Sequence, residues 1–413
     1  MNRRVVVTGY GVVSPVGIGI DKYWNSLIAG KSGVSKITQF DTTGFDSAIA
    51  GEANDFVPPS YFTSKDLLRI PRFIQFAMKA SDEAIEMAKL NTEKMDPYRA
   101  GTVIGCGVGS LETIEDEYMI LIEKGPRKLS PFLIPRLITN EAAGHVAIRH
   151  KLKGPNFCTV TACASGAHAI GESYWAIRCN RADVMVCGGT EAAVVKTATG
   201  GFIAIKALCK KYNDEPERGS RPFDLDRCGF IMAEGAGTIV LEEYEHAKKR
   251  GVPILAELAG YGATCDAHHV TAPEPEGRPA SKAIEIALGM AGVSKDDYVY
   301  INAHGTSTKL NDKMETNAIK LALGKNAYKV NISSTKSMTG HTIGAAGAIE
   351  FIVACLAVQK KVIPPTINYE TPDPDCDLNY TPNKAVERDV KVALSNSLGF
   401  GGHNATLLVK EFK

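Results

Sequence analysis

The sequence predicts a layered α/β protein in which sheets are covered by helices. Short β-rich runs alternate with helical segments along the whole chain. A length of 413 residues is also large for a single hydrophobic core. We therefore expect two sub-domains that share an interface.

The elements that support this fold class follow one another in a regular order. Strands are expected at residues 5–8, 102–105, 183–187, 237–241, 298–303, 330–334 and 391–395. Helices are expected at 73–90, 280–291 and 342–359, where apolar residues recur at helical spacing. Proline-rich or charged loops are expected at 213–227, 273–279 and 372–382.

Bulk composition excludes several classes of function. A net charge of +1 with 23% charged residues argues against a nucleic-acid-binding protein. The ten cysteines are scattered without a CxxC pair, which indicates a reduced, cytosolic protein rather than a disulfide framework or a zinc site. The chain enters a β-rich run at once, so no signal peptide is expected. No uninterrupted apolar run approaches membrane-spanning length, so we expect a cytoplasmic protein without a membrane partner.

The strongest chemical signal lies in residues 156–171. Residues 157–160 predict a short buried strand, and the small residues from Ala162 onward begin a helix. Cys163 stands where the period changes, close to a helix N-terminus whose free N–H groups and dipole favour a thiolate. The sequence therefore points to a nucleophilic Cys163, although a buried cysteine that only packs remains the alternative at this point.

Three further segments place polar groups after expected strands. His304 follows the run 298–303, Lys336 and His341 follow the run 330–334, and Phe400 lies in a glycine-rich turn. Taken singly, a loop histidine is more often structural, and Lys336 is an ordinary surface lysine. Together, one cysteine at a helix start and two histidines at strand ends form a thiol–imidazole set suited to acyl transfer. No motif supports a hydrolase, kinase or dehydrogenase, because the sequence lacks GxSxG, Walker A and strand-linked GxGxxG motifs.

Two segments of the chain resemble each other. Residues 157–171 and 331–344 each predict a strand, a small-residue turn and a Gly/Ala-rich helix. Such a repeat predicts two related halves, with Cys163 and the loop 336–341 in corresponding places.

Taken together, these motifs resemble those of the β-ketoacyl-[acyl-carrier-protein] synthases of the thiolase superfamily, and most of all their elongating condensing enzymes. The matching segments cover essentially the whole chain: 4–11, 105–109, 125–132, 162–166, 220–224, 303–308, 335–341 and 399–402. Thiolases proper pair a second cysteine with one histidine, and the pathway-starting synthases have Asn in place of the second histidine. The resemblance implies a thiolase-like five-layer αβαβα fold of two similar halves, which we expect at residues 1–255 and 256–413. It also implies a homodimer.

The resemblance implies roles for the candidate residues. Cys163 takes the acyl chain from an acyl-carrier-protein thioester, and the backbone N–H groups of Cys163 and Phe400 form the oxyanion hole. His304 and His341, both neutral, stabilise the enolate formed when malonyl-carrier protein loses carbon dioxide. Lys336 orients His341 and adds positive potential. The implied reaction is a decarboxylative Claisen condensation that yields a 3-oxoacyl product two carbons longer, as in fatty-acid elongation.

The resemblance also implies binding residues. The acyl tunnel is assigned to Val108, Phe202 and Phe400, and the phosphopantetheine arm to Thr271, Thr306 and Thr308. A basic patch for the acidic acyl carrier protein is assigned to Lys65, Arg69, Arg127, Lys128 and Lys206. No cofactor is required, since the partner carries the phosphopantetheine; a monovalent cation is expected beside Asn302, Glu350, Ser395 and Asn396.

Three positions depart from the family pattern. Val108 replaces a larger Ile, Cys228 stands where an Asp usually precedes Gly-Phe, and Lys309 replaces a common Pro. Two alternatives stay open. One is a polyketide-type condensing enzyme with a dedicated carrier protein; the other is a catalytically silent partner, a class that usually lacks the nucleophile present here.

Overall fold

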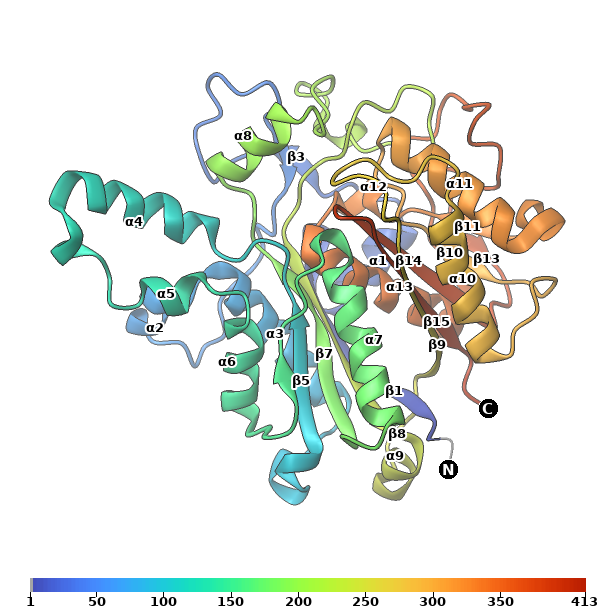
Figure 1. Cartoon of the computed structure of the whole chain (residues 1–413), viewed down its shortest axis with the longest axis horizontal. Helices are drawn as coiled ribbons and strands as arrows, with labels where there is room; N and C mark the ends of the chain where they lie inside the picture. Colours follow the sequence, from blue (N-terminus) through green and yellow to red (C-terminus); the bar gives the residue numbers. More distant parts are fainter. Residues whose placement is uncertain (1–2) are drawn as a thin grey trace.

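The computed structural model describes residues 3–413, which form helices packed around a large mixed sheet (Figure 1). The strands are β1 (Val5–Ser14), β2 (Gly17–Ile18), β3 (Val34–Lys36), β4 (Ile49–Gly51), β5 (Ala100–Gly105), β6 (Asn156–Phe157), β7 (Val184–Glu191), β8 (Gly235–Glu243), β9 (Ala256–Cys265), β10 (Tyr300–Asn302), β11 (Asn331–Ser333), β12 (Val362–Ile363), β13 (Val386–Glu387), β14 (Val392–Gly399) and β15 (His403–Lys410). The helices are α1 (Ile20–Ile28), α2 (Ser64–Arg69), α3 (Arg72–Met87), α4 (Leu111–Lys124), α5 (Leu133–Leu137), α6 (Glu141–His150), α7 (Ser165–Arg178), α8 (Lys196–Ala204), α9 (Tyr244–Arg250), α10 (Arg278–Ala291), α11 (Lys309–Leu323), α12 (Lys336–Thr339) and α13 (Ala346–Lys360). Short 3-10 turns include η3 (Pro126–Lys128), η4 (Ala162–Ala164) and η7 (Ile343–Ala345).

The main sheet consists of two halves with the same strand arrangement. Its order is β11-β10-β14-β15-β9-β1-β8-β7-β5-β6, with β2 paired to β1. In one half, β6, β5 and β7 run parallel while β8 and β1 are antiparallel; β11, β10, β14, β15 and β9 repeat this pattern in the other. The halves meet where Val5–Val7 of β1 pair with residues 256–258 of β9. The prediction of two similar halves is confirmed, whereas the boundary at 255/256 stays a prediction.

Helices form three layers around the two half-sheets (Figure 1). Helices α7 and α13 lie between the halves and contribute to one shared core. Helices α3 and α6 cover the outer face of the first half, and α10 and α11 cover that of the second. The result is the five-layer αβαβα arrangement that the resemblance implied.

The central helix α13 is apolar on every side because both of its faces meet sheet. Residues 346 to 358 are all buried. The stretch Ile343–Lys360 has a mean hydropathy of 1.6, and 89% of it is buried inside the protein. By length and composition it is long and apolar enough to cross a membrane, although Glu350 interrupts its apolar run. A helix between two sheets has no polar face to present.

Two long strands, β9 and β15, escaped prediction, and in β9 glycine masks the alternation. Strands β9 and β15 pair along eight residue pairs. A Cβ on Gly260 would lie 2.2 Å from the Ala287 carbonyl oxygen, and one on Gly262 would lie 1.9 Å from that of Ala283. Helix α10 therefore crosses β9 at backbone contact, and only glycine permits this approach.

The strand expected at 157–160 is shorter and less buried than predicted. Strand β6 spans Asn156–Phe157, and the side chain of Val160 is 54% exposed. The reason is its position at the edge of the sheet, where one side has no neighbouring strand.

The cysteines also depart from the expected reduced pattern. Cys209 and Cys228 form a disulfide, and the other eight cysteines are free thiols. The two partners are 19 residues apart in the sequence without a spacing motif, so only the fold brings them together.

Candidate active site

Cys163 lies at the strand-to-helix turn where it was predicted. It is the middle residue of η4, directly before α7, and it lines a cavity of about 510 Å³. The matching turn in the other half is η7, directly before α13. The first residues of the two turns, Ala162 and Ile343, both have a left-handed backbone, with φ of 49° and 47°. Gly344 is therefore the counterpart of Cys163. The sequence had placed this counterpart in the loop 336–341, a few residues too early.

Burial decides the ionisation of Cys163. Enclosure by protein raises the pKa of its thiol to about 12, although the Lys336 ammonium acts in the opposite direction. The expected effect of the helix terminus, which favours the thiolate, is therefore outweighed by burial. Loss of hydration destabilises the anion more than the nearby positive charges stabilise it.

His304 is held by a carboxylate that the sequence reading missed. It follows β10, and the backbone N–H groups of His304 and Gly305 each donate to one oxygen of Glu315, at 2.8 Å. A signal for Glu315 existed in the sequence. It falls on the apolar stripe of α11 with Ala318, Ile319 and Ala322, all buried, where a charged residue needs a polar partner.

His341 is fixed by backbone contacts on both sides. Its N–H donates to the Ile231 carbonyl at 2.7 Å, and its carbonyl accepts from the Ala233 N–H at 2.9 Å. Its ring lies 5.3 Å from the His304 ring, at 88°, and 5.3 Å from the Phe230 ring. Burial lowers the pKa of both histidines well below the usual value, and Lys336 lowers each further. Both imidazoles are therefore neutral, as predicted.

Lys336 contacts His304 rather than His341. Its Nζ lies 3.4 Å from Nδ1 of His304 and pairs with Oε1 of Glu350. It is 1% exposed, so the surface-lysine alternative is wrong. An ammonium has only donors, so Nδ1 of His304 accepts and its proton resides on Nε2. Burial raises the pKa of Glu350 to about 7, with Lys336 opposing the shift.

The turn that carries Phe400 packs directly against the nucleophile. A Cβ on Gly399 would lie 2.8 Å from the Thr161 carbonyl oxygen and 3.2 Å from the Cys163 nitrogen. Phe400 itself lines the cavity with Cys163, His304 and His341. The residue before Phe400 therefore lies against the backbone N–H of Cys163, one of the two groups assigned to the oxyanion hole.

The expected substrate residues gather around the same cavity. Its lining includes Phe202, Lys206, Thr271, Thr306 and Thr308. Val108 packs with Cys163 and Phe202 in a single apolar cluster.

The five basic residues assigned to the carrier protein lie on three different elements. All five side chains are exposed: Lys65, Arg69, Arg127, Lys128 and Lys206. Lys206 lines the cavity, and Lys65 and Arg69 belong to α2. Arg127 and Lys128 belong to η3, which lies between α4 and α5 in the chain (Figure 1). Arg69 lies over the Phe132 ring at 4.4 Å, which ties α2 to the segment that follows η3.

Comparison with known proteins agrees with this geometry. Residues 2–247 match the family model "Beta-ketoacyl synthase, N-terminal domain", and residues 255–370 match its C-terminal domain. The chain belongs to the β-ketoacyl synthase family. It is 48% identical over 411 residues to a 3-oxoacyl-[acyl-carrier-protein] synthase 2 of Synechocystis sp., covering 100% of this chain and 99% of that protein. It is 45% identical over 412 residues to the protein of the same name in Staphylococcus aureus strain COL, covering 100% and 99%.

A solved structure of the family shares the fold closely. It is a type II PKS acyl-carrier protein in complex with its ketosynthase bound to the hexaketide. The TM-score is 0.93 and the identity 38%, with both chains covered in full. The thiolase-like prediction is therefore confirmed.

The residues expected to surround a monovalent cation offer a partial donor set. Three buried oxygens have no hydrogen-bond partner in residues 3–413, namely Oδ1 of Asn302, Oε2 of Glu350 and Oγ of Ser395. Asn302 and Ser395 are directly paired across β10 and β14. The fourth expected residue, Asn396, donates its amide N–H to Glu315, and its amide oxygen accepts from the Thr406 hydroxyl. The three free oxygens fit a hard monovalent cation.

Proposed function

We propose that this chain is a 3-oxoacyl-[acyl-carrier-protein] synthase that elongates acyl chains by two carbons. One observation carries the proposal: Cys163 and two neutral histidines, His304 and His341, converge on one apolar cavity. The names of full-length relatives at 45–48% identity support it. The intact nucleophile argues against a catalytically silent partner.

The first step transfers an acyl group to Cys163. Its sulfur attacks the thioester carbonyl of the acyl carrier, a C–S bond forms, and the bond to the carrier sulfur breaks. The Cys163 proton ends on the released carrier thiol, so the exchange of one thioester for another needs no net base. Backbone N–H groups of Cys163 and Phe400 stabilise the negative charge of the tetrahedral intermediate.

The second step generates a carbanion from the malonyl thioester. Its carbonyl oxygen accepts hydrogen bonds from Nε2–H of His304 and His341 while carbon dioxide leaves. Neutral donors suit this charge, because they stabilise the enolate without protonating it. The carbanion then attacks the acyl-Cys163 carbonyl, the C–S bond to Cys163 breaks, and the leaving thiolate takes up one proton from solvent. Lys336 keeps Nδ1 of His304 an acceptor and adds positive potential beside the developing anion.

The remaining expectations belong to this proposal. Thr271, Thr306 and Thr308 bind the phosphopantetheine arm, and the acyl carrier protein meets Lys206 at the cavity and the basic residues of α2 and η3. A monovalent cation held by Asn302, Ser395 and Glu350 would balance buried negative charge and brace β10 against β14. The proposal includes a homodimer, supported by the exposed apolar side chains on α4, which include Tyr118 (59%), Met119 (53%) and Ile122 (65%). It also includes a cytoplasmic location.

An acylation assay tests the function. Purified protein is incubated with acyl-carrier protein, then with malonyl-carrier protein, and followed by intact-mass and product mass spectrometry. Wild type and Cys179→Ala should each gain one acyl group and release a 3-oxoacyl product, whereas Cys163→Ala should do neither. Cys179 is a fair control because it is an exposed thiol at the opposite end of α7. Acylation at another cysteine would refute the assignment, and products with several unreduced keto groups would favour the polyketide alternative.

A further inference from the structure

The Cys209–Cys228 disulfide joins two segments that both form the wall of the active-site cavity. Cys228 lines the cavity and is partly exposed, whereas Cys209 is fully buried. Their Cα atoms are 4.9 Å apart, within the usual range for a disulfide. The condensation uses neither sulfur, so the cross-link has no role in the chemistry described above.

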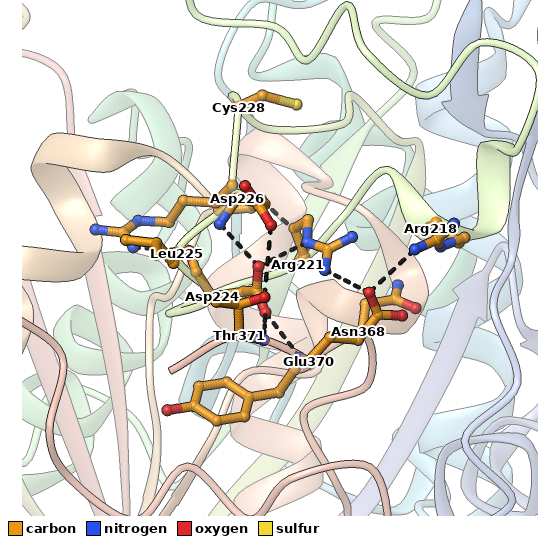
Figure 2. A network of polar contacts seen from close by, with 12 residues as sticks. Arg218, Arg221, Asp224, Leu225, Asp226, Cys228, Asn368, Glu370 and Thr371 are labelled. Atoms are coloured by element: carbon orange, nitrogen blue, oxygen red, sulfur yellow. Dashed lines mark hydrogen bonds and ion pairs between the residues drawn. The ribbon is translucent and has the colours of Figure 1, made fainter. Parts of the chain in front are cut away.

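The Cys228 side of the cross-link is firmly anchored. Figure 2 shows Cys228 beside a polar network in which Asp224 accepts from Arg221 Nε at 2.9 Å and from the N–H groups of Glu370 and Thr371 at 2.7 Å. The buried Arg227 pairs with Asp373 and donates to the Thr308 carbonyl. These bonds fix residues 221–228 whether or not the disulfide is present.

The Cys209 side has fewer polar restraints. Two backbone hydrogen bonds join it to Phe230: Phe230 N–H to the Ala207 carbonyl at 3.0 Å, and Cys209 N–H to the Phe230 carbonyl at 3.1 Å. Leu208 and Cys209 are buried in apolar clusters, and Lys210 pairs with Asp46. The least restrained part is residues 205–207, where Ile205 and Lys206 are exposed.

Residues 205–207 form part of the cavity wall. Ile205, Lys206 and Ala207 line the cavity, and Phe202 at the end of α8 meets the Phe230 ring at 5.2 Å. Their position therefore decides how closely the wall approaches a bound acyl-pantetheine.

We propose that the Cys209–Cys228 disulfide is a redox-controlled clamp that holds the wall at residues 202–207 against Phe230 and so sets the affinity for carrier-bound acyl substrates. The proposal rests on the proposed function for its substrate. A dithiol reductant supplies two electrons and two protons: the S–S bond breaks, each cysteine becomes a thiol, and the dithiol closes to its own disulfide. In proteins of reducing compartments, disulfides of this kind are usually transient and redox-sensing.

Reduction should weaken binding and leave turnover largely intact. His341 keeps its backbone bonds to Ile231 and Ala233, so the catalytic groups stay in place. Released from the clamp, residues 205–207 have several positions, and substrate must select one of them. We expect KM for acyl-carrier protein to rise by at least about fivefold, the lower end of typical coupling between two sites.

The test compares oxidised and dithiothreitol-reduced protein, with Cys209→Ser/Cys228→Ser as a permanently unlinked variant and Cys179→Ser as the control. Iodoacetamide trapping and peptide mass spectrometry establish the state of each cysteine. Wild type and control should show the KM increase on reduction and its reversal on reoxidation. The unlinked variant should have the raised KM in both conditions and no response to the reductant.

A second readout separates the clamp from the proposed function. The rate of Cys163 alkylation by N-dodecyl chloroacetamide, relative to that by iodoacetamide, reports the fit of an alkyl chain without requiring condensation. It should fall in the unlinked variant. If the ratio falls but no condensation occurs, the clamp stands and the proposed function fails. If the unlinked variant condenses with the KM and the alkylation ratio of the oxidised wild type, the clamp is refuted. Alkylation of Cys209 and Cys228 in protein never exposed to reductant also refutes it.

Discussion

Substitution of Gly399 by alanine tests whether the turn beside Cys163 supplies an oxyanion donor. The added methyl would lie 2.8 Å from the Thr161 carbonyl oxygen, a backbone atom that cannot swing aside. Ordinary contact needs about 3.4 Å or more, so the Phe400 turn must retreat by roughly half an ångström. Donors act on the oxyanion only within a narrow range of distance. We therefore expect acyl transfer to Cys163 to slow by about 10–10²-fold, and overpacking to destabilise the fold by about 1–3 kcal/mol.

Time-resolved intact-mass spectrometry of the acyl-enzyme measures this rate, and thermal unfolding measures the stability. Gly289→Ala is a matched control, because no atom lies within 4 Å of its added methyl and it should acylate normally. A Gly399→Ala protein that melts earlier yet acylates at the wild-type rate would show that the turn has a structural role only.

Three further predictions concern the nucleophile, the buried ion pair and the tunnel. Because burial raises the pKa of Cys163 to about 12, the thiolate fraction should grow with pH. Peptide-mapped alkylation by iodoacetamide should therefore accelerate about tenfold per pH unit from 7 to 9; a plateau below pH 8 would contradict this. Lys336→Met leaves Glu350 buried without a partner and should lower the free energy of unfolding by about 3–5 kcal/mol, measured by chemical denaturation. The double variant Lys336→Met/Glu350→Leu should regain this stability but not malonyl decarboxylation. Equal losses of stability in both variants would contradict the pairing. Val108→Phe should confine the enzyme to short acyl groups. Extra side-chain volume in a filled apolar tunnel should lower kcat/KM for the acyl chains that reach it by about tenfold or more. An unchanged chain-length profile would exclude Val108 from the tunnel.

The residues that carry the chemistry were recognisable from the sequence alone. Cys163 and His304 each stand where a short apolar run ends and small or polar residues begin, whereas α12 separates His341 from the end of β11. Such a change of pattern is local, because strands and helices bury residues with different periods along the chain. The alternation of elements likewise predicted a layered α/β fold, since each amphipathic element needs another to cover it.

Only the tertiary structure decided which partner each group meets. Lys336 contacts His304 instead of His341, Glu315 holds the His304 backbone, and Cys209 bonds to Cys228. These contacts join segments that no local pattern relates. Their geometry follows from how α11, α12 and the loop 221–228 pack against neighbouring strands.

Tertiary packing also set the electrostatics of Cys163. From the sequence, a helix N-terminus indicated a thiolate, yet the folded protein encloses the sulfur and raises the pKa of its thiol. A dipole belongs to one helix and can be predicted from local sequence. Desolvation depends on every segment that closes around the group, here from α8, β14 and the loop after β10, and it emerges only when the whole chain is folded.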